Sequence, residues 1–275
     1  MTQAALPRPL GLDHLTVLEL PPPALIALAA RIGYTCVGLR LYPAYPGGVY
    51  YELAPGSAAL RALRRQLRDD GVTIYDVEFV TIVADFVPAR LTAMLAAAAE
   101  LGAARLSVCA DDPEPSRLTA NFAALCDLAG GFGMGVDLEF MAWRRVNSLA
   151  AAVAVVTAAG RGNGGVLVDA LHLARTGGMP ADLAAVPPAL LRSAQLCDAP
   201  AARPASEAAG IQEARAQRFP PGAGALPLAA LLAALPSDAR LSAEVPMTNA
   251  MTAEQRATLV HRATRALLDR GAPAA

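Results

Sequence analysis

The sequence predicts an α/β fold, a single-domain (β/α)8 TIM barrel over residues 1–275. Short Val/Ile/Leu-rich runs alternate eight times with Ala/Leu-rich segments of helical period, and eight such units suit a barrel of about 250 residues. The first run lacks a following GxGxxG pattern, which disfavours the main rival fold, a doubly wound open sheet. Polar residues end several runs, where a barrel places its chemistry.

The predicted strands are the apolar runs. They cover residues 13–20, 36–42, 72–80, 105–110, 135–141, 165–171, 192–198 and 240–246. The predicted helices lie between them, at residues 22–33, 57–71, 88–102, 116–131, 147–160, 226–235 and 252–271, with a shorter segment around 179–186. Residues typical of helix N-caps and of helix ends stand at these boundaries, namely Ser57, Ser116, Asn147 and Thr252 at the starts and Gly33, Gly71, Gly102 and Gly271 at the ends.

The longest stretch without a helical or strand period is residues 199–225. It follows the seventh predicted strand, so in a barrel it overhangs the face that carries the active site. Long loops at such positions are usually functional. We therefore predict a long active-site loop at 199–225.

Composition excludes several classes of protein. The formal net charge is −1, so no basic field gathers nucleic acid or anionic lipid. Polar residues interrupt every apolar run well before the roughly 18 residues of a membrane span. All 23 basic residues are arginine, which excludes a Schiff-base lysine, a pyridoxal-phosphate anchor and a P-loop lysine. The predicted partner is a small molecule, anionic or polyhydroxylated; the sequence is also compatible with a homo-oligomer.

The four cysteines form no CxxC pair, which excludes zinc-ribbon and thioredoxin-like sites. Buried, reduced thiols are expected. The first residues lack a basic start followed by a long apolar region, so they do not resemble a signal peptide. We therefore predict a cytoplasmic protein.

Oxygen-bearing side chains end four consecutive predicted strands. They are Glu139, Asp169, Gln195 and Glu244 on strands five to eight. Adjacent strand ends of a barrel converge, and three carboxylates brought together repel one another unless a positive charge lies between them. A divalent cation is the simplest such charge, and an all-oxygen donor set favours Mn²⁺ or Mg²⁺ over Zn²⁺. The alternative is that each acid pairs with an arginine from a loop.

Five segments carry a resemblance to a known family, and they are LEFMAW (138–143), GVLVDALHLARTGG (165–178), AQLCDAP (194–200), RFPPGAGALPL (218–228) and LSAEVP (241–246). Together they resemble the xylose-isomerase-like TIM barrels, often labelled sugar phosphate isomerase/epimerase. In that family Glu, Asp, His and Glu at the ends of strands five to eight hold a metal ion. The resemblance implies the ligands Glu139, Asp169 and Glu244, with Gln195 where many members have His.

The glutamine is shared by members that resemble bacterial 3-dehydroshikimate dehydratases. The basic His that those members carry a few residues after the Trp is absent here, because residues 144–146 are Arg, Arg and Val. The three histidines are too few for the His-rich trinuclear site of the family's endonuclease branch. His14 is expected at the start of the first strand, away from the site, in a structural role.

Other candidate site residues lie near these strand ends. His172 matches the family's DxxH motif with Asp169 and is a candidate proton shuttle or an orienting group for that acid. Arg40, which ends strand two, either binds an anionic substrate group or pairs with Glu78, which ends strand three. Further candidates for substrate contact are Trp143, Arg215 and Arg218.

The predicted function is a divalent-metal-dependent isomerase or epimerase of a polyhydroxylated carbonyl compound, a sugar, sugar phosphate or sugar acid. Glu139 and Glu244 would exchange protons with the carbon next to the carbonyl that the metal polarises. The alternative is a lyase of the 3-dehydroshikimate dehydratase type, in which a β-hydroxyl leaves and His172 or a carboxylate protonates it. A third hypothesis is a non-catalytic barrel that binds a sugar acid.

Overall fold

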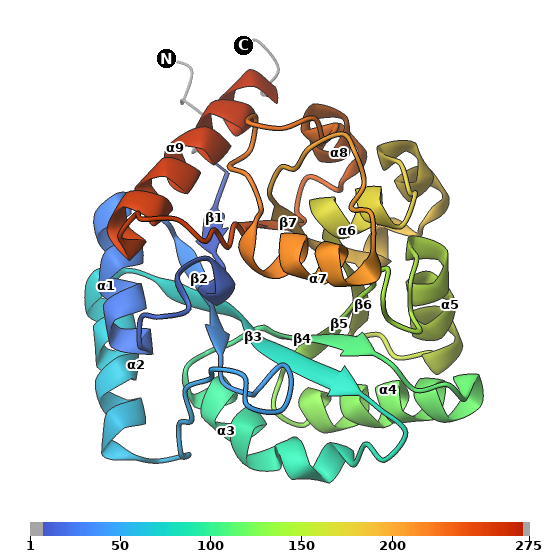
Figure 1. Ribbon diagram of the computed structural model, residues 1–275. Coiled ribbons are helices and arrows are strands. Elements are labelled where there is room, and N and C mark those ends of the chain that lie inside the picture. The colour runs from blue at the N-terminus through green and yellow to red at the C-terminus, as the bar shows by residue number, and fades with distance from the viewer. Residues whose placement is uncertain (1–7, 272–275) are drawn as a thin grey trace, which may run out of the picture.

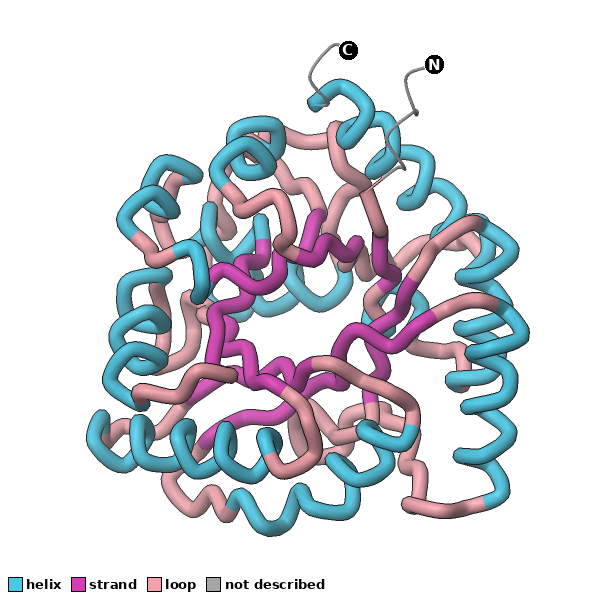
Figure 2. Tube along the Cα trace, turned by 180° about the vertical axis from the view of Figure 1, so that it is seen from behind, coloured by secondary structure: helices cyan, strands magenta, loops and turns pink. Residues whose placement is uncertain are grey.

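The computed structural model describes residues 8–271 and shows a closed barrel of eight parallel strands in sequence order (Figures 1 and 2). The strands are β1 Leu10–Leu12, β2 Cys36–Arg40, β3 Thr73–Ile82, β4 Arg105–Ala110, β5 Gly135–Glu139, β6 Gly164–Asp169, β7 Leu191–Leu196 and β8 Arg240–Ala243. The predicted TIM barrel is confirmed. The ends of the predicted domain, residues 1–7 and 272–275, lie outside the described residues.

Helices surround the barrel on its outer face (Figure 2). They are α1 Pro22–Ile32, α2 Ala58–Asp70, α3 Thr92–Glu100, α4 Pro115–Gly130, α5 Leu149–Ala159, α6 Ala170–Arg175, α7 Glu207–Ala216, α8 Leu228–Ala234 and α9 Ala253–Gly271, with 3-10 helices η1 His14–Val17, η2 Pro88–Leu91, η3 Pro180–Ala185 and η4 Pro188–Leu190. The short helix predicted around 179–186 is the 3-10 helix η3.

The helix ends follow local chemistry. Ser57 caps α2, as predicted, by accepting a hydrogen bond from the Leu60 backbone N–H at 3.1 Å, and Gly33 ends α1 in the left-handed conformation. Two predicted N-caps are displaced along the chain. Glu114 rather than Ser116 caps α4, and Ser148 rather than the preceding residue caps α5, since in each case the neighbouring side chain reaches the free N–H groups of the first turn.

The strand predicted at residues 13–20 is wrong. β1 ends at Leu12, and the following residues form η1. The Thr16 hydroxyl donates to the Ala243 carbonyl at 3.1 Å and accepts from the Val245 N–H at 2.9 Å, so it ties this turn to the end of β8. His14 consequently lies beyond the carboxyl end of β1, at the opposite end from the predicted one.

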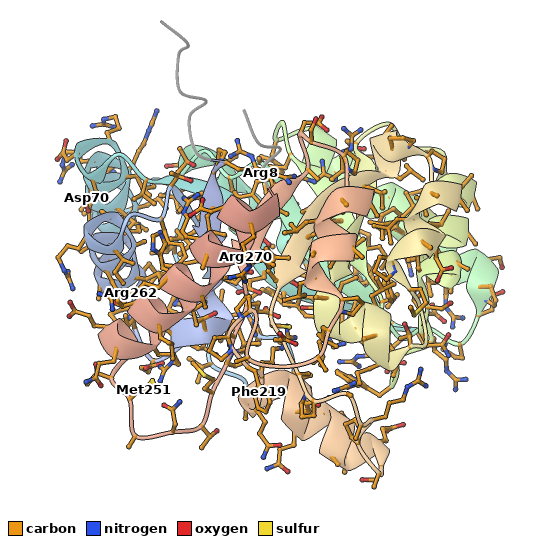
Figure 3. All side chains as sticks on the ribbon, turned by 90° about the horizontal axis from the view of Figure 1, so that it is seen from above. Arg8, Asp70, Phe219, Met251, Arg262 and Arg270 are labelled. Atoms are coloured by element: carbon orange, nitrogen blue, oxygen red, sulfur yellow. The ribbon has the colours of Figure 1, made fainter. Side chains whose placement is uncertain are left out.

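The stretch 199–225 is not irregular throughout. It contains α7, which Ser206 caps by accepting from the Ala209 N–H. Figure 1 shows α7 in front of the barrel mouth, and Figure 3, seen from above, places Phe219 and Met251 on that side, with Arg8 and Asp70 on the opposite one. The insertion therefore overhangs the carboxyl ends of the strands, as predicted.

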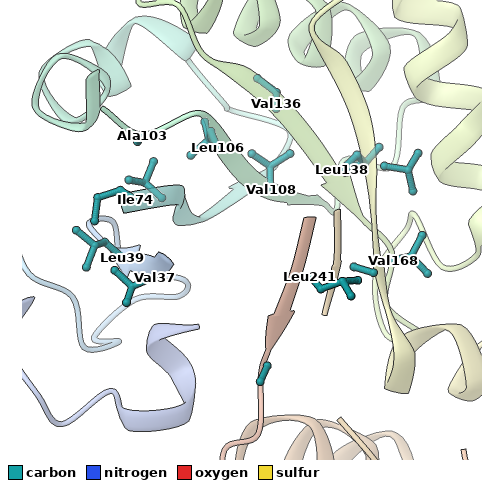
Figure 4. Packing of buried hydrophobic residues seen from close by; sticks show 14 of the residues in the cluster. Val37, Leu39, Ile74, Ala103, Leu106, Val108, Val136, Leu138, Val168 and Leu241 are labelled. Atoms are coloured by element: carbon teal, nitrogen blue, oxygen red, sulfur yellow. The ribbon is translucent and has the colours of Figure 1, made fainter. Parts of the chain in front are cut away.

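Apolar side chains fill the space between the strands and the helices. Leu106 and Val108 on β4 lie beside Val136 and Leu138 on β5, and all four are fully buried (Figure 4). These residues alternate with inward-facing ones because side chains of a strand point to opposite faces in turn. The apolar layer accordingly holds the barrel together from outside.

The barrel interior is polar below the strand ends. Arg105 pairs with Asp137, whose Oδ2 also accepts from the Ser193 hydroxyl at 3.0 Å. Gly165 makes room for this group, because a Cβ atom there would lie 2.5 Å from Asp137 Oδ1 and 2.6 Å from Arg192 Cγ. Small residues therefore allow buried charges to fill the barrel.

We expect Gly165→Ala to lower the free energy of unfolding by about 1–3 kcal/mol, since the added methyl group overpacks this ion pair. Gly162→Ala is the matched control, because a Cβ atom at that position meets nothing within 4 Å. Urea unfolding of the three proteins measures the effect. Equal stability of both variants would show that the interior relaxes around the methyl group.

Within residues 8–271, no helix has the length and apolar character needed to cross a membrane.

Candidate active site

A pocket of about 190 Å³ opens among the strand ends on the side that α7 overhangs. Eight of the predicted site residues line it, namely Arg40, Glu78, Glu139, Trp143, His172, Arg215, Arg218 and Glu244. The remaining two, Asp169 and Gln195, are buried without reaching its wall. The structure thus gathers at one site side chains that are spread over two hundred residues of the sequence.

The four predicted metal ligands stand on adjacent strands, as expected. Asp169 is the direct neighbour of Gln195 in the β6–β7 register, and Gln195 is paired with Ser242, two residues before Glu244. One ligand-capable atom from each of Glu139, Asp169 and His172 lies within 4.8 Å of the others. His172 is therefore a candidate donor that the ligand prediction did not contain.

Arg218 lines the pocket and also lies inside the acidic cluster. Its Nη1 is 2.5 Å from Asp169 Oδ2 and its Nη2 is 2.9 Å from Glu244 Oε2. The side chain is only 2% exposed. The alternative in which arginines neutralise the acids is thus realised for Asp169 and Glu244. Among the described residues, the nearest basic side-chain nitrogen to the Glu139 carboxylate is His172 Nε2, at 3.7 Å, and no arginine pairs with it.

These surroundings give the three carboxyl groups different pKa values. Burial, together with the charges of Glu244 and Asp169, raises the pKa of Glu139 well above its ordinary value. Burial likewise raises the pKa of Glu244 to about 8, against the opposing effect of Arg218. Burial alone would also raise the pKa of Asp169, but Arg218 and His172 hold it below the ordinary value. The site therefore holds one firmly ionised acid and two that take up a proton readily.

His172 is held at the start of α6. Its backbone N–H donates to Asp169 Oδ1 at 2.9 Å, so Asp169 is also the N-cap of that helix. The imidazole meets the Trp143 ring edge to face at 5.2 Å between centroids. Burial lowers the pKa of His172 to about 4, so the ring is neutral at pH 7. A neutral ring can bind a metal or accept a hydrogen bond, but with this pKa it is protonated too rarely at pH 7 to act as a general acid.

Arg40 and Glu78 form an ion pair with each other, and both side chains also line the pocket. Arg40 Nη2 is 3.2 Å from Glu78 Oε2, and both side chains are buried. The Arg40 backbone N–H donates to Nδ1 of His14, whose Nε2 donates to the Leu20 carbonyl. His14 thus has the structural role that the sequence predicted, though at the other end of the strand.

Unpaired polar atoms concentrate at this pocket. Among the described residues, eight buried side-chain atoms lack a hydrogen-bond partner. Five belong to pocket-lining residues, namely Arg40 Nε, Glu78 Oε1, Trp143 Nε1, Arg144 Nε and His172 Nδ1. Buried polar groups are normally satisfied, so this concentration indicates a site built for a ligand with several oxygen atoms.

The rim and the apolar wall contain residues that the sequence analysis missed. Arg215 lies over the Tyr45 ring at 4.4 Å, joining α7 to the loop after β2. Phe79 and Met141 line the pocket beside Glu78 and Glu139. Phe79 directly follows Glu78, and Met141 lies two residues after Glu139, so their nearness to two predicted site residues could have identified them. Tyr45 lies in an aperiodic loop that offers no such signal.

The donor set fits a divalent metal ion. When ionised, the three buried carboxylates carry more negative charge than the single Arg218 guanidinium neutralises. Gln195 Oε1 is buried without any hydrogen-bond partner, in a side chain adjacent to Asp169. An unpaired oxygen beside surplus negative charge is what a cation requires.

Solved structures with this fold include several metal or sugar proteins. An IolI protein with a bound zinc atom superposes with a TM-score of 0.79 and 18% identity, over 97% of this chain and all of that one. D-Psicose 3-epimerase, determined in the presence of D-fructose, superposes with a TM-score of 0.69 and 15% identity, over 96% of this chain and 98% of that one. A fusion of a xylose isomerase-like TIM barrel with 4-hydroxyphenylpyruvate dioxygenase superposes with a TM-score of 0.78 and 21% identity.

The superposition with the fusion protein includes 97% of this chain but only 43% of the fusion protein. This chain therefore spans less than half of that relative. Identities at this level show a shared fold alone. No functionally curated protein matches the sequence. The family model for the xylose isomerase-like TIM barrel, however, matches residues 26–265, which is most of the chain. The protein therefore belongs to the xylose isomerase-like TIM-barrel family.

Proposed function

We propose that this protein is a divalent-metal-dependent isomerase or epimerase of a polyhydroxylated carbonyl compound, with Mn²⁺ or Mg²⁺ as its metal. The observation that carries the proposal is the pair Glu139 and Glu244. Both line one pocket, and both have raised pKa values. General acid–base catalysis is most efficient when the catalytic pKa lies near the working pH.

Glu139, Asp169, Gln195 and Glu244 would hold the ion, and the ion would polarise a substrate carbonyl and acidify the neighbouring C–H. One of the two glutamates takes that proton and the other returns one to carbon. Asp169, held ionised by Arg218, keeps its negative charge throughout. His172, neutral at pH 7, orients the site through the Asp169 cap and accepts hydrogen bonds from substrate hydroxyls.

Substrate binding falls to the unpaired donors and the apolar wall. Arg40 Nε, Trp143 Nε1 and Arg144 Nε each offer an N–H without a partner. Phe79 and Met141, which pack in one cluster with Trp143, add apolar surface to the same pocket. A compound with an oxygen-rich face, an anionic group and one apolar face matches this lining.

The second candidate is a lyase of the 3-dehydroshikimate dehydratase type. Gln195 favours it, because that residue stands where many epimerase-like members have His. The same proton abstraction would then be followed by loss of a β-hydroxyl group. The proton that the leaving hydroxyl group takes up would come from Glu139 or Glu244 rather than His172. With a pKa of about 4, the histidine is rarely protonated at neutral pH and cannot supply that proton efficiently.

Deuterium incorporation distinguishes these functions. The Mn²⁺-loaded protein is incubated in D₂O with sugars, sugar acids and cyclic hydroxy acids, and products are analysed by NMR and mass spectrometry. Deuterium at carbon without change of formula supports the isomerase, and loss of water supports the lyase. Binding without exchange or product across the panel would contradict both and leave the non-catalytic barrel.

We expect Arg40→Ala to raise KM for an anionic substrate about 10- to 100-fold, the worth of one charge-assisted hydrogen bond, with kcat changed little. The reason is that Arg40 holds a substrate group remote from the reacting carbon, which is uniform binding. Steady-state kinetics measure the split. Arg90→Ala, on η2, is the control for loss of an arginine away from the acids. Unchanged KM in Arg40→Ala would show that Arg40 serves only Glu78.

A further inference from the structure

The Arg218 side chain is fixed from two directions. On one side its Nε donates to the Ala214 carbonyl at 2.8 Å, at the end of α7. On the other side its two terminal nitrogens contact Asp169 Oδ2 and Glu244 Oε2, and Nη1 also donates to the Glu244 carbonyl at 3.2 Å. The insertion thus delivers one positive charge into the middle of the acidic cluster.

We propose that Arg218 is a built-in counter-cation that competes with the divalent metal ion for Asp169 and Glu244, and so sets the metal affinity of the site. This inference rests on the proposed metal-dependent function. It assigns to the insertion a role in tuning the metal, in addition to the substrate contact that the sequence predicts.

The competition follows from charge. When the three acids are ionised, as they must be to bind a cation, they and the guanidinium together carry a net charge of about −2, and without the guanidinium the same acids carry about −3. A guanidinium and a divalent ion that share carboxylates also repel each other, and this repulsion is strong within a buried site. Replacing the guanidinium with a neutral side chain removes both penalties.

Removing Arg218 could also weaken metal binding, because Arg218 helps to position the two acids. This effect is expected to be smaller than the gain from removing the competing charge. Asp169 is held by the β6 backbone and by the His172 N–H, and Glu244 directly follows β8, where its N–H donates to the Leu196 carbonyl. The closed barrel therefore positions the Asp169 carboxylate and the Glu244 backbone independently of Arg218. Gln195 Oε1 has no hydrogen-bond partner even with the guanidinium in place, so the cluster keeps one oxygen free to bind a cation.

Mn²⁺ titration of the metal-free proteins, by calorimetry and by the loss of the free Mn²⁺ electron paramagnetic resonance signal, tests this proposal. We expect Arg218→Met to lower the Kd for Mn²⁺ about tenfold or more. Arg218→Lys keeps the charge but not the fork that spans both acids, so its Kd should lie between those of wild type and Arg218→Met. Arg215→Met, which removes the neighbouring arginine that lies over Tyr45, should leave Kd unchanged.

Thermal unfolding supplies a second readout. Metal-free Arg218→Met should melt below wild type because three acids are left with no cation, and Mn²⁺ should raise its melting temperature more than that of wild type. Should Arg218→Met and Arg218→Gln both be unfolded without metal, recovery of the native circular dichroism spectrum on adding Mn²⁺ supports the competition, and failure to recover contradicts it.

The outcomes separate this inference from the proposed function. Equal or weaker Mn²⁺ binding by Arg218→Met overturns the competition and leaves the metal site intact, because Arg218 would then be a positioning residue. Absence of Mn²⁺ binding in wild type together with binding in Arg218→Met shows that the guanidinium occupies the site and supports the competition. Absence of binding in every protein overturns both the metal site and the competition.

Discussion

Exhaustive chelation is expected to abolish turnover, and Mn²⁺ or Mg²⁺ to restore it. The three carboxylates of the cluster are buried, and only Arg218 offsets them. Without a further cation, the surplus negative charge opposes formation of another negative charge on a substrate. Activity is measured after chelation and dialysis, and again after adding Mn²⁺, Mg²⁺ or Zn²⁺ in turn. The all-oxygen donor set should give the highest activity with Mn²⁺ or Mg²⁺.

Circular dichroism of the chelated protein is the control, because it separates loss of metal from loss of fold. The barrel should stay folded, since its apolar layer lies outside the strands and away from the cluster. Full activity in protein that elemental analysis shows to hold no metal would contradict both the ligand assignment and the mechanism. Preference for Zn²⁺ would instead indicate that His172 joins the ligands, because a nitrogen donor favours that ion.

Glu244→Gln should lower kcat by about 10²–10⁴-fold while the protein stays folded. The amide keeps an oxygen for Arg218 and for a metal ion, so the change removes chiefly the ability to take up or release a proton. Burial raises the pKa of the native carboxyl to about 8, close to the pH at which a general acid or base is most effective. The rate of deuterium exchange at carbon measures this step directly.

Glu254→Gln, an exposed change on α9, is the matched control and should leave kcat unchanged. Mn²⁺ affinity of Glu244→Gln is measured in parallel, so that a loss of metal is not mistaken for a loss of proton transfer. If Glu244→Gln binds Mn²⁺ and turns over within a few-fold of wild type, the proton transfer belongs to Glu139 with another partner.

Local patterns in the sequence were enough to predict the barrel and the positions of its acids. The apolar runs alternate with helical segments, and the side chains that end the runs must meet once the strands close. Glu139, Asp169, Gln195 and Glu244 were therefore predicted as neighbours without any knowledge of loops. The same patterns failed at residues 13–20, where an apolar run forms a turn because Thr16 bonds to β8, more than two hundred residues away.

By itself, then, the sequence determined the fold class, the order of the strands and the set of acids at one end of the barrel, because periods of 2 and 3.6 residues and strand-end positions are local properties. Only the tertiary structure decided which charges meet. Arg218 lies 49 residues from Asp169 in the chain, within an insertion that has no strand period. Its contact with two acids depends on how α7 crosses the barrel mouth, which no local pattern records. For Arg40 the sequence left two alternatives open, and the β2–β3 register, in which Arg40 and Glu78 are partners, produced the pairing.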